Sequence, residues 1–356
     1  MTIETADNRC HYFDFLRVAA ICVVMILHVA STDWYTPDLH TFEWQVINFW
    51  HGSMFRWGVP VFTMISGALF LSRDIPLRKI YGKYVLRLFV ALVFWSIIYS
   101  CARYAVTRDL ADAVTLFFNG GFYHLWFLPV IIGLYMIQPF MRKIAESELL
   151  TKYFLVLAII FTFIMPEAAE VISIFSEECG TIANGLVSRF QPNFVAGLTF
   201  YFLMGYFLNN LKITPKIKRL LYALAIFGLI WGQSLSVVAS FVTGSPNETF
   251  YATGGSNETF YEHISVCGLC VSMAVFIFFK EKFNRPSRII RTLSKYTFGT
   301  YLFHAFVISV FKHLGFTPLI FNPIISVPVI FVIVFVISFS VSALLNHIPV
   351  INKYIV

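Results

Sequence analysis

Long apolar runs separated by short polar connections dominate the pattern along the chain. The runs are about 20 residues long, the length with which an α-helix crosses the hydrocarbon core of a bilayer. They lack the strict alternation of barrel strands. Ten runs are predicted to span a membrane: residues 12–31, 47–71, 84–106, 123–141, 150–166, 193–210, 219–242, 261–281, 296–315 and 322–345. The pattern therefore predicts an all-α polytopic membrane protein, with residues 1–356 forming a single integral membrane domain.

The composition supports this class and narrows the functions. Hydrophobic residues make up 58% of the 356 residues and charged residues only 13%, against about 25% charged residues in soluble domains. The net charge of +7 would be compatible with nucleic-acid binding. However, the basic residues lie in short connections between apolar runs, which is the signature of membrane topology. We therefore expect no nucleic-acid partner.

Lysine and arginine are concentrated in every second connection. The second, fourth, sixth and eighth connections hold most of them, including Lys79, Lys143, Lys216 and Arg288. The odd-numbered connections hold only Arg108 and Arg189. Since basic connections stay in the cytoplasm, an even number of spans predicts that both termini are cytoplasmic.

The first apolar run, YFDFLRVAAICVVMILHVAS, contains three polar residues, Asp14, Arg17 and His28. A charge near the centre of a lipid-facing helix costs about 3 kcal/mol or more. Arg17 and His28 are 11 residues apart, so they differ by only about 20° around the helix and by about 16 Å along it. Asp14 lies one turn before Arg17, where it can pair with it. Snorkelling to the two interfaces would explain each residue alone, but not why both fall on one helix face.

Further polar residues occur inside or beside the other predicted spans. Arg87 follows Lys83 on the same face near the cytoplasmic end, and Arg288 and Arg291 lie in a facing connection. The guanidinium group of arginine and the ammonium group of lysine both bind phosphates.

Arg56, Ser66, His124 and His304 are candidate acceptor contacts or second polar partners. For Ser66, with Gly67 beside it, a close helix contact is the alternative. We expect Trp126 and His51 to be interfacial. Cys267 and Cys270 lie one turn apart in an apolar run without a nearby histidine, so helix packing is favoured over a metal site.

Four segments resemble the acyltransferase-3 family of membrane-bound O-acyltransferases. They are R-x10-H preceded by DFL in the first run, RWGVPVFTMISGALF, FYHLWFLPVIIGLYMIQPF and GTYLFHAF. They stand in the family's order from about Tyr12 to Leu345, and the pattern is similar to the enterobacterial-common-antigen O-acetyltransferase type, which has the membrane domain alone. Lys83 departs from the arginine pair that the family often has at this place.

The resemblance implies transfer of an acetyl group from cytoplasmic acetyl-CoA to a sugar hydroxyl of a cell-envelope glycan, at the inner membrane. It also implies that Arg17 and His28 are essential. The chemistry agrees, because a base for the hydroxyl suits His28 and cations for the donor's phosphates suit Arg17, Lys83, Arg87, Arg288 and Arg291. Acetyl-CoA would be a co-substrate, and we expect no permanently bound cofactor and no metal. The other expected partners are a glycan or lipid-linked sugar and membrane lipids.

Two other functions remain open at this point. In a secondary transporter, His28, His124 and His304 would form a proton relay, although no half-to-half repeat of the kind common in transporters is evident. In a flippase-like partner of glycan assembly, no chemistry would occur. The acceptor sugar, direct transfer against an acyl-histidine, and the oligomeric state are not decided by the sequence. Nor is the role of the segment at residues 243–262, in which NETFY occurs twice.

Overall fold

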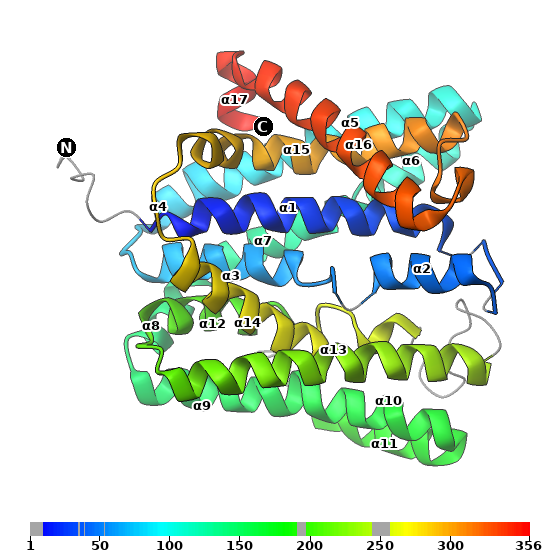
Figure 1. Cartoon of the computed structure of the whole chain (residues 1–356). Coiled ribbons are helices and arrows are strands. Elements are labelled where there is room, and N and C mark those ends of the chain that lie inside the picture. The colour runs from blue at the N-terminus through cyan, green and yellow to red at the C-terminus, as the bar shows by residue number, and fades with distance from the viewer. Residues whose placement is uncertain (1–9, 35, 39, 53, 191–196, 244–256) are drawn as a thin grey trace.

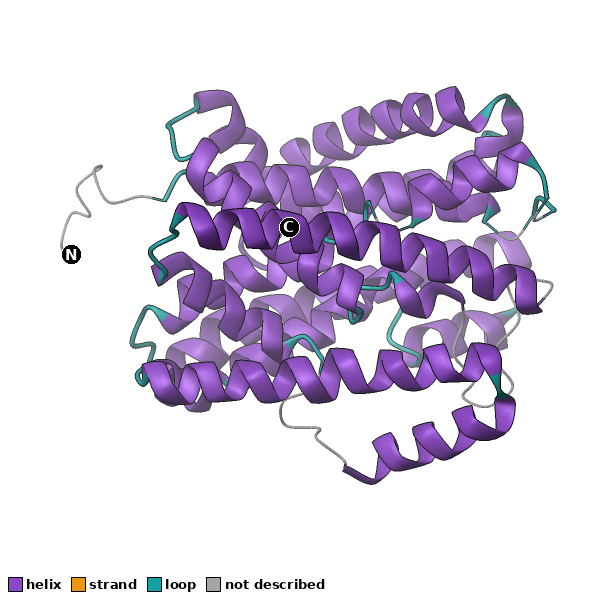
Figure 2. Ribbon diagram, turned by 60° about the horizontal axis from the view of Figure 1, so that its bottom comes forward, coloured by secondary structure: helices purple, strands orange, loops and turns teal. Residues whose placement is uncertain are grey.

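The computed structural model describes residues 10–34, 36–38, 40–52, 54–190, 197–243 and 257–356, and the described residues are helical without any strand (Figures 1 and 2). The α-helices are α1 (Tyr12–Ala30), α2 (Phe42–His51), α3 (Gly58–Leu71), α4 (Leu77–Lys79), α5 (Leu86–Thr107), α6 (Leu110–Phe118), α7 (Phe127–Met136), α8 (Gln138–Ala145), α9 (Glu148–Ala158), α10 (Met165–Phe175), α11 (Glu177–Phe190), α12 (Thr199–Asn210), α13 (Pro215–Thr243), α14 (Val266–Lys282), α15 (Arg288–His313), α16 (Pro323–Asn346) and α17 (Pro349–Tyr354). Short 3₁₀ segments are η1 (Ser31–Asp33), η3 (Tyr123–Trp126), η5 (Asn257–Phe260) and η6 (Pro318–Ile320), and η2 (Ile80–Val85) and η4 (Ile159–Ile164) are π-helical.

The protein is all-α and polytopic, as predicted. Seven helical segments within the described residues are long and apolar enough to cross a membrane. Each of the ten predicted runs contains a helix, but the three runs that hold α3, α12 and α14 are not among these seven segments. These helices have 14, 12 and 17 residues. The count of ten spans therefore stays a prediction.

The run 47–71, predicted as one span, is interrupted. Helix α2 ends at His51, Gly52 follows with non-helical backbone angles, and α3 begins only at Gly58. Pro60 lies in the first turn of α3, where a missing N–H costs nothing because that N–H would have no helical partner. The sequence between the two helices carries Arg56, so the interruption places a charged side chain on a turn instead of in a continuous helix.

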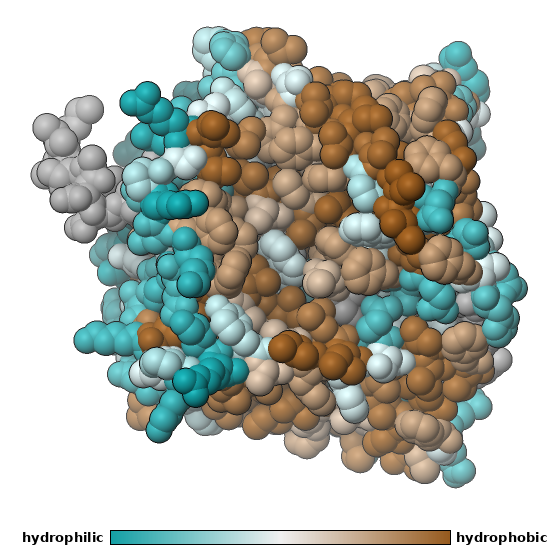
Figure 3. Space-filling view, in the orientation of Figure 1, coloured by the Kyte–Doolittle hydropathy of each residue, from teal (hydrophilic) through white to brown (hydrophobic). Residues whose placement is uncertain are grey.

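The surface has the character of a membrane protein. Hydrophobic residues cover the middle of the molecule and hydrophilic residues gather at two opposite ends (Figure 3). The connections at α4, between α8 and α9, and between α14 and α15 lie together at one end (Figure 1). These are the basic connections of the sequence, and we call this the basic end. Its assignment to the cytoplasm remains a prediction.

Helix α1 runs through the interior of the bundle, where it contacts α3, α14, α15 and α16 (Figure 1). Helices α3 and α12 cross so closely that a Cβ atom on Gly67 would lie 1.6 Å from the Phe202 carbonyl oxygen. A Cβ on Gly205 would lie 2.0 Å from the Met64 oxygen. Small residues allow such backbone contacts between membrane helices, and this contact fixes α3 beside α12, while α3 also packs on α1.

Two smaller expectations concern α14 and the segment before it. Cys267 and Cys270 are buried and face Gly232 and Gly228 of α13, so they pack between helices as predicted. The second copy of the repeated sequence begins at η5. The first copy, with Asn247, lies outside the described residues.

Candidate active site

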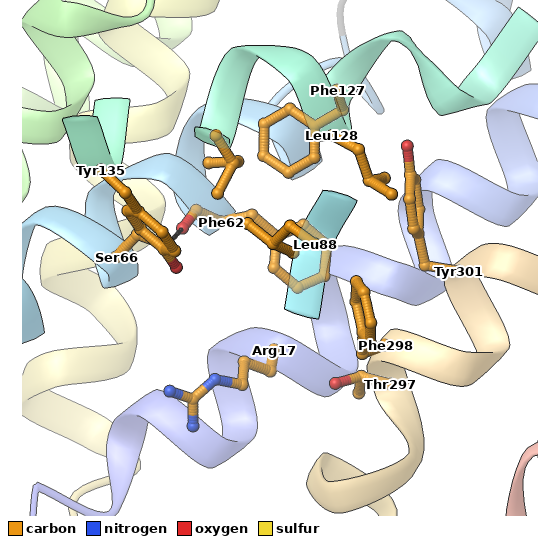
Figure 4. A pocket seen from close by; sticks show the side chains of 11 residues that line it. Arg17, Phe62, Ser66, Leu88, Phe127, Leu128, Tyr135, Thr297, Phe298 and Tyr301 are labelled. Atoms are coloured by element: carbon orange, nitrogen blue, oxygen red, sulfur yellow. Dashed lines mark hydrogen bonds between the residues drawn. The ribbon is translucent and has the colours of Figure 1, made fainter. Parts of the chain in front are cut away.

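The residues along one face of α1 line two cavities. The first, which we call the Arg17 cavity, has a volume of about 180 Å³. Its polar lining is Arg17, Ser66, Tyr135 and Thr297, and the rest is apolar or aromatic: Phe62, Leu88, Phe127, Leu128, Ile131, Phe298 and Tyr301. In Figure 4, Arg17 and the pair Phe127 and Tyr301 lie on opposite sides of this space.

The second, which we call the His28 cavity, also has a volume of about 180 Å³. It is more polar, with Arg56 and Glu262 as charged lining residues beside several imidazoles. Its lining comprises Val24, Leu27, His28, Phe55, Arg56, Val59, His124, Trp126, Phe127, Glu262, His263 and Tyr301. Phe127 and Tyr301 line both cavities, so the two spaces adjoin at an aromatic wall.

Arg17 is held at its cavity by Asp14. Arg17 Nη1 lies 3.3 Å from Asp14 Oδ1, so the predicted pairing within α1 is confirmed. The same Asp14 oxygen accepts a hydrogen bond of 2.9 Å from the Ser294 hydroxyl of α15. Asp14 is buried, and a buried carboxylate with two donors restricts the positions that its arginine partner adopts.

His28 is bonded to another histidine from the far end of the sequence. His28 Nδ1 lies 2.8 Å from Nε2 of His304 on α15, and the two rings are nearly parallel, with an interplanar angle of 8°. His304 is completely buried, and its Nδ1 lies 2.7 Å from the Tyr301 carbonyl oxygen. The sequence singled out both histidines but gave no indication that they touch.

His124 completes a cluster of three histidines from α1, η3 and α15. Its ring lies edge-on to that of His304, with centroids 5.1 Å apart, and its Nε2 lies 3.4 Å from the Leu302 carbonyl oxygen. The His124 carbonyl accepts a hydrogen bond from the Tyr301 hydroxyl. The Nδ1 atom of His124 is buried and has no hydrogen-bond partner among the described residues, although the side chain lines the His28 cavity.

Arg56 is fixed on the other side of the His28 cavity. Its Nε donates a hydrogen bond of 3.1 Å to the His51 carbonyl, and Nη2 lies 2.9 Å from His51 Nε2. Its guanidinium lies over the Tyr261 ring and 3.9 Å from Glu262. The interfacial position expected for His51 is wrong: the side chain is buried, because the turn after α2 folds it against Arg56.

Trp126 is 40% exposed, which an interfacial anchor allows, but it also belongs to the His28 cavity. Its ring stacks on that of His263, with centroids 5.1 Å apart and an interplanar angle of 26°. The Trp126 ring offers an apolar surface next to polar groups of the cavity. This lining suits a ligand that has one apolar face and polar groups around its edge.

The other cations predicted to bind the donor lie outside the Arg17 cavity. Arg87 donates a hydrogen bond of 2.6 Å to the Val356 carbonyl, although its neighbour Leu88 lines the cavity. Lys83, Arg288 and Arg291 are exposed at the basic end. Ser66, which we expected on the acceptor side, lines the Arg17 cavity instead. Of the predicted donor-binding residues, Arg17 lines the Arg17 cavity, and Lys83, Arg87, Arg288 and Arg291 line neither of the two cavities.

Comparison with known protein families gives a match that spans almost the whole chain. The acyltransferase-3 family model, described as an acyltransferase domain, matches residues 11–347. The chain belongs to the acyltransferase-3 family. Searches of curated proteins and of solved structures found no match. As a member of this family, the protein is a multi-pass membrane acyltransferase that acts on a sugar hydroxyl.

Several lining residues of this acyltransferase were not singled out from the sequence. Phe127 and Tyr301 stand inside the segments FYHLWF and GTYLFHAF, so the family motifs contained a signal for them. Glu262 and His263 lie in a short connection without any motif. They reach the cavity from the connection that leads into α14, which begins at Val266.

Proposed function

We propose that the protein is an O-acetyltransferase that moves an acetyl group from cytoplasmic acetyl-CoA to a sugar hydroxyl of a cell-envelope glycan at the inner membrane. One observation carries the proposal. A single helix face presents Arg17 to one cavity and His28 to an adjoining cavity, and the two share Phe127 and Tyr301 as a wall.

The Arg17 cavity suits the acyl end of a coenzyme A thioester. Its lining is mainly apolar and aromatic. Such a lining favours the uncharged arm of coenzyme A that carries the thioester over the charged nucleotide part. Arg17 is the charged lining residue, and a guanidinium makes forked hydrogen bonds to phosphate. Lys83, Arg288 and Arg291 are exposed at the basic end, where they would attract the phosphorylated nucleotide part of the donor from solution.

The His28 cavity suits a sugar acceptor. It combines an indole ring, imidazoles and the ion pair between Arg56 and Glu262. The indole offers a flat apolar surface, and the polar groups offer both donors and acceptors for hydroxyls. A ligand with many hydroxyl groups and apolar ring faces matches this lining.

The chemistry then needs a base at the point where the two cavities meet. His28 accepts the proton of the acceptor hydroxyl while that oxygen attacks the thioester carbonyl carbon, and the carbon–sulfur bond breaks. The departing thiolate of coenzyme A takes the proton back from the His28 imidazolium. Every atom and charge is accounted for by donor, acceptor and His28 alone.

The test is acetyl transfer by purified protein with radiolabelled acetyl-CoA and a lipid-linked glycan. We expect label in the glycan with the wild type, none with His28→Ala, and retained coenzyme A binding by calorimetry in that variant. His313→Ala is the matched control, since His313 is exposed near the end of α15. Transfer by His28→Ala at the wild-type rate would refute the role of His28.

The same preparation separates the enzyme from the transporter alternative. Reconstitution in proteoliposomes, without any acetyl donor, measures solute uptake. Uptake that depends on the histidine cluster, together with no label in the glycan, would overturn the proposed function.

A further inference from the structure

We infer that His304 is a positioning residue that sets the tautomer of His28 and turns the basic nitrogen Nε2 of His28 towards the acceptor. The inference rests on the proposed function for its purpose, but its geometry stands on three hydrogen-bonding groups. These are the Tyr301 carbonyl, the His304 ring and the His28 ring.

The first step fixes the proton of His304. A carbonyl oxygen can only accept a hydrogen bond. Since His304 Nδ1 lies 2.7 Å from the Tyr301 carbonyl oxygen, Nδ1 must carry a hydrogen. His304 is completely buried, and among the described residues no carboxylate forms an ion pair with it. A second proton would therefore place an unpaired charge in the bundle interior, which is costly.

The second step carries this choice to His28. With its one proton on Nδ1, the neutral His304 ring has a lone pair on Nε2 and can only accept there. His28 Nδ1 lies 2.8 Å from that atom, so His28 Nδ1 donates. The single proton of neutral His28 is thereby placed on Nδ1, and its Nε2 keeps the lone pair that a general base requires.

The third step compares this arrangement with known catalytic histidines. In serine proteases a buried aspartate accepts from Nδ1 of the catalytic histidine and so fixes its tautomer and orientation. His304 performs the same two tasks without bringing a net charge into the membrane interior. When His28 takes the acceptor proton, its bond to His304 becomes charge-assisted and therefore stronger.

The surroundings keep His304 in place for this role. The Tyr301 hydroxyl donates to the His124 carbonyl, which ties α15 to η3 one turn before His304. The Tyr99 hydroxyl of α5 donates a bond of 2.9 Å to the Leu302 carbonyl. Side chains locked by such a second layer of hydrogen bonds hold a reactive group more accurately than free rotamers do.

Two substitutions separate positioning from folding. His304→Gln retains a side-chain oxygen that can accept from His28 Nδ1, whereas His304→Leu fills the space and accepts nothing. We expect His304→Leu to reduce kcat about 100-fold or more, with unchanged coenzyme A affinity, because a disordered base loses most of its contribution. We expect His304→Gln to recover most of that loss. Thr300→Val is the control for the loss of a buried polar group from the same helix, since within the described part of the chain the Thr300 hydroxyl bonds to the Tyr296 carbonyl one turn earlier and to no other group.

Nitrogen-15 NMR of histidine-labelled protein reads the tautomer directly, whether or not the protein transfers acetyl groups. The expected result is a proton on Nδ1 of His28 in the wild type and in His304→Gln, and a mixture of tautomers in His304→Leu. A proton on Nε2 of His28 in the wild type, or full kcat in a folded His304→Leu variant, would overturn the inference. An inactive wild type that shows the expected tautomer would instead count against the proposed function alone.

Discussion

Glu167 of α10 offers a sharp test of how the His28 cavity is supported from a distance. Its buried carboxylate accepts two hydrogen bonds of 2.6 Å, one from the Trp231 indole of α13 and one from the backbone N–H of Val266. Val266 is the first residue of α14, directly after the connection that brings Glu262 and His263 to the cavity. Glu167 therefore holds the point at which that connection joins α14.

The magnitude follows from the two bonds. Hydrogen bonds to a charged group contribute about 1.5–3 kcal/mol each, so Glu167→Ala should destabilise the protein by about 3–6 kcal/mol. Glu167→Gln keeps one acceptor oxygen and presents an amide N–H₂ to the other donor, so we expect about half of that loss. With the connection loosened, the acceptor KM should rise about tenfold, the equivalent of about 1.4 kcal/mol, while coenzyme A affinity stays unchanged.

The assay pairs thermal unfolding in detergent with kinetics at varied acceptor concentration. Glu148→Gln is the control, because Glu148 lies exposed at the start of α9 and, among the residues that the structure describes, forms its ion pair with Lys152 alone, and exposed ion pairs contribute at most about 1 kcal/mol. If Glu167→Ala unfolds at the wild-type temperature and keeps the wild-type acceptor KM, the carboxylate does not support the cavity and our reasoning is refuted.

Four further predictions follow from the fold and the cavities. Arg17→Ala should weaken coenzyme A binding in calorimetry, and Arg17→Lys should restore it only in part because the forked geometry is lost; unchanged affinity in both would remove Arg17 from the donor site. Gly67→Ala should lower the unfolding temperature, since its Cβ would lie 1.6 Å from a backbone oxygen of α12 and overpacking costs about 1–3 kcal/mol; equal stability would contradict the close crossing. Phe127→Ala should raise hydrolysis of acetyl-CoA in the absence of acceptor, measured by thiol release, because it opens the wall between the cavities; a rate equal to the wild type would argue against that wall. Cysteines introduced at Lys79 and Arg288 should react from the cytoplasmic side and one in the α5–α6 connection from the opposite side; labelling of all three from one side would refute the predicted topology.

The sequence predicted the features that are determined within a single helix or a single connection. Helical apolar runs, the alternation of basic connections and the shared face of Arg17 and His28 all follow from periodicity within a single segment. The contact between His28 and His304 joins residues 276 positions apart. It depends on how α15 is rotated against α1, which no local pattern specifies.

Two details of the site show the same limit. Arg87 donates a hydrogen bond to the Val356 carbonyl because the end of the chain packs on α5. The sequence shows only a basic residue close to Lys83, and this pattern favoured a ligand-binding role over a bond within the protein. The break between α2 and α3 was missed because the apolar character continues across Phe55 and Trp57. Hydropathy does not distinguish an apolar turn buried in protein from a helix in lipid.

The aromatic wall of Phe127 and Tyr301 has an electrical consequence for the cell. Under the proposed function, the donor and the acceptor arrive from opposite sides of an energised membrane, and a continuous water-filled path between the two cavities would dissipate the ion gradient. Each elementary charge that crosses dissipates about 2.3 kcal/mol per 100 mV. Phe127 and Tyr301 line both cavities, and we expect these rings to interrupt any chain of water molecules between the cavities while an uncharged acyl group passes. On that proposal, the wall would let the acyl group reach an acceptor on the other side of the bilayer without a proton leak.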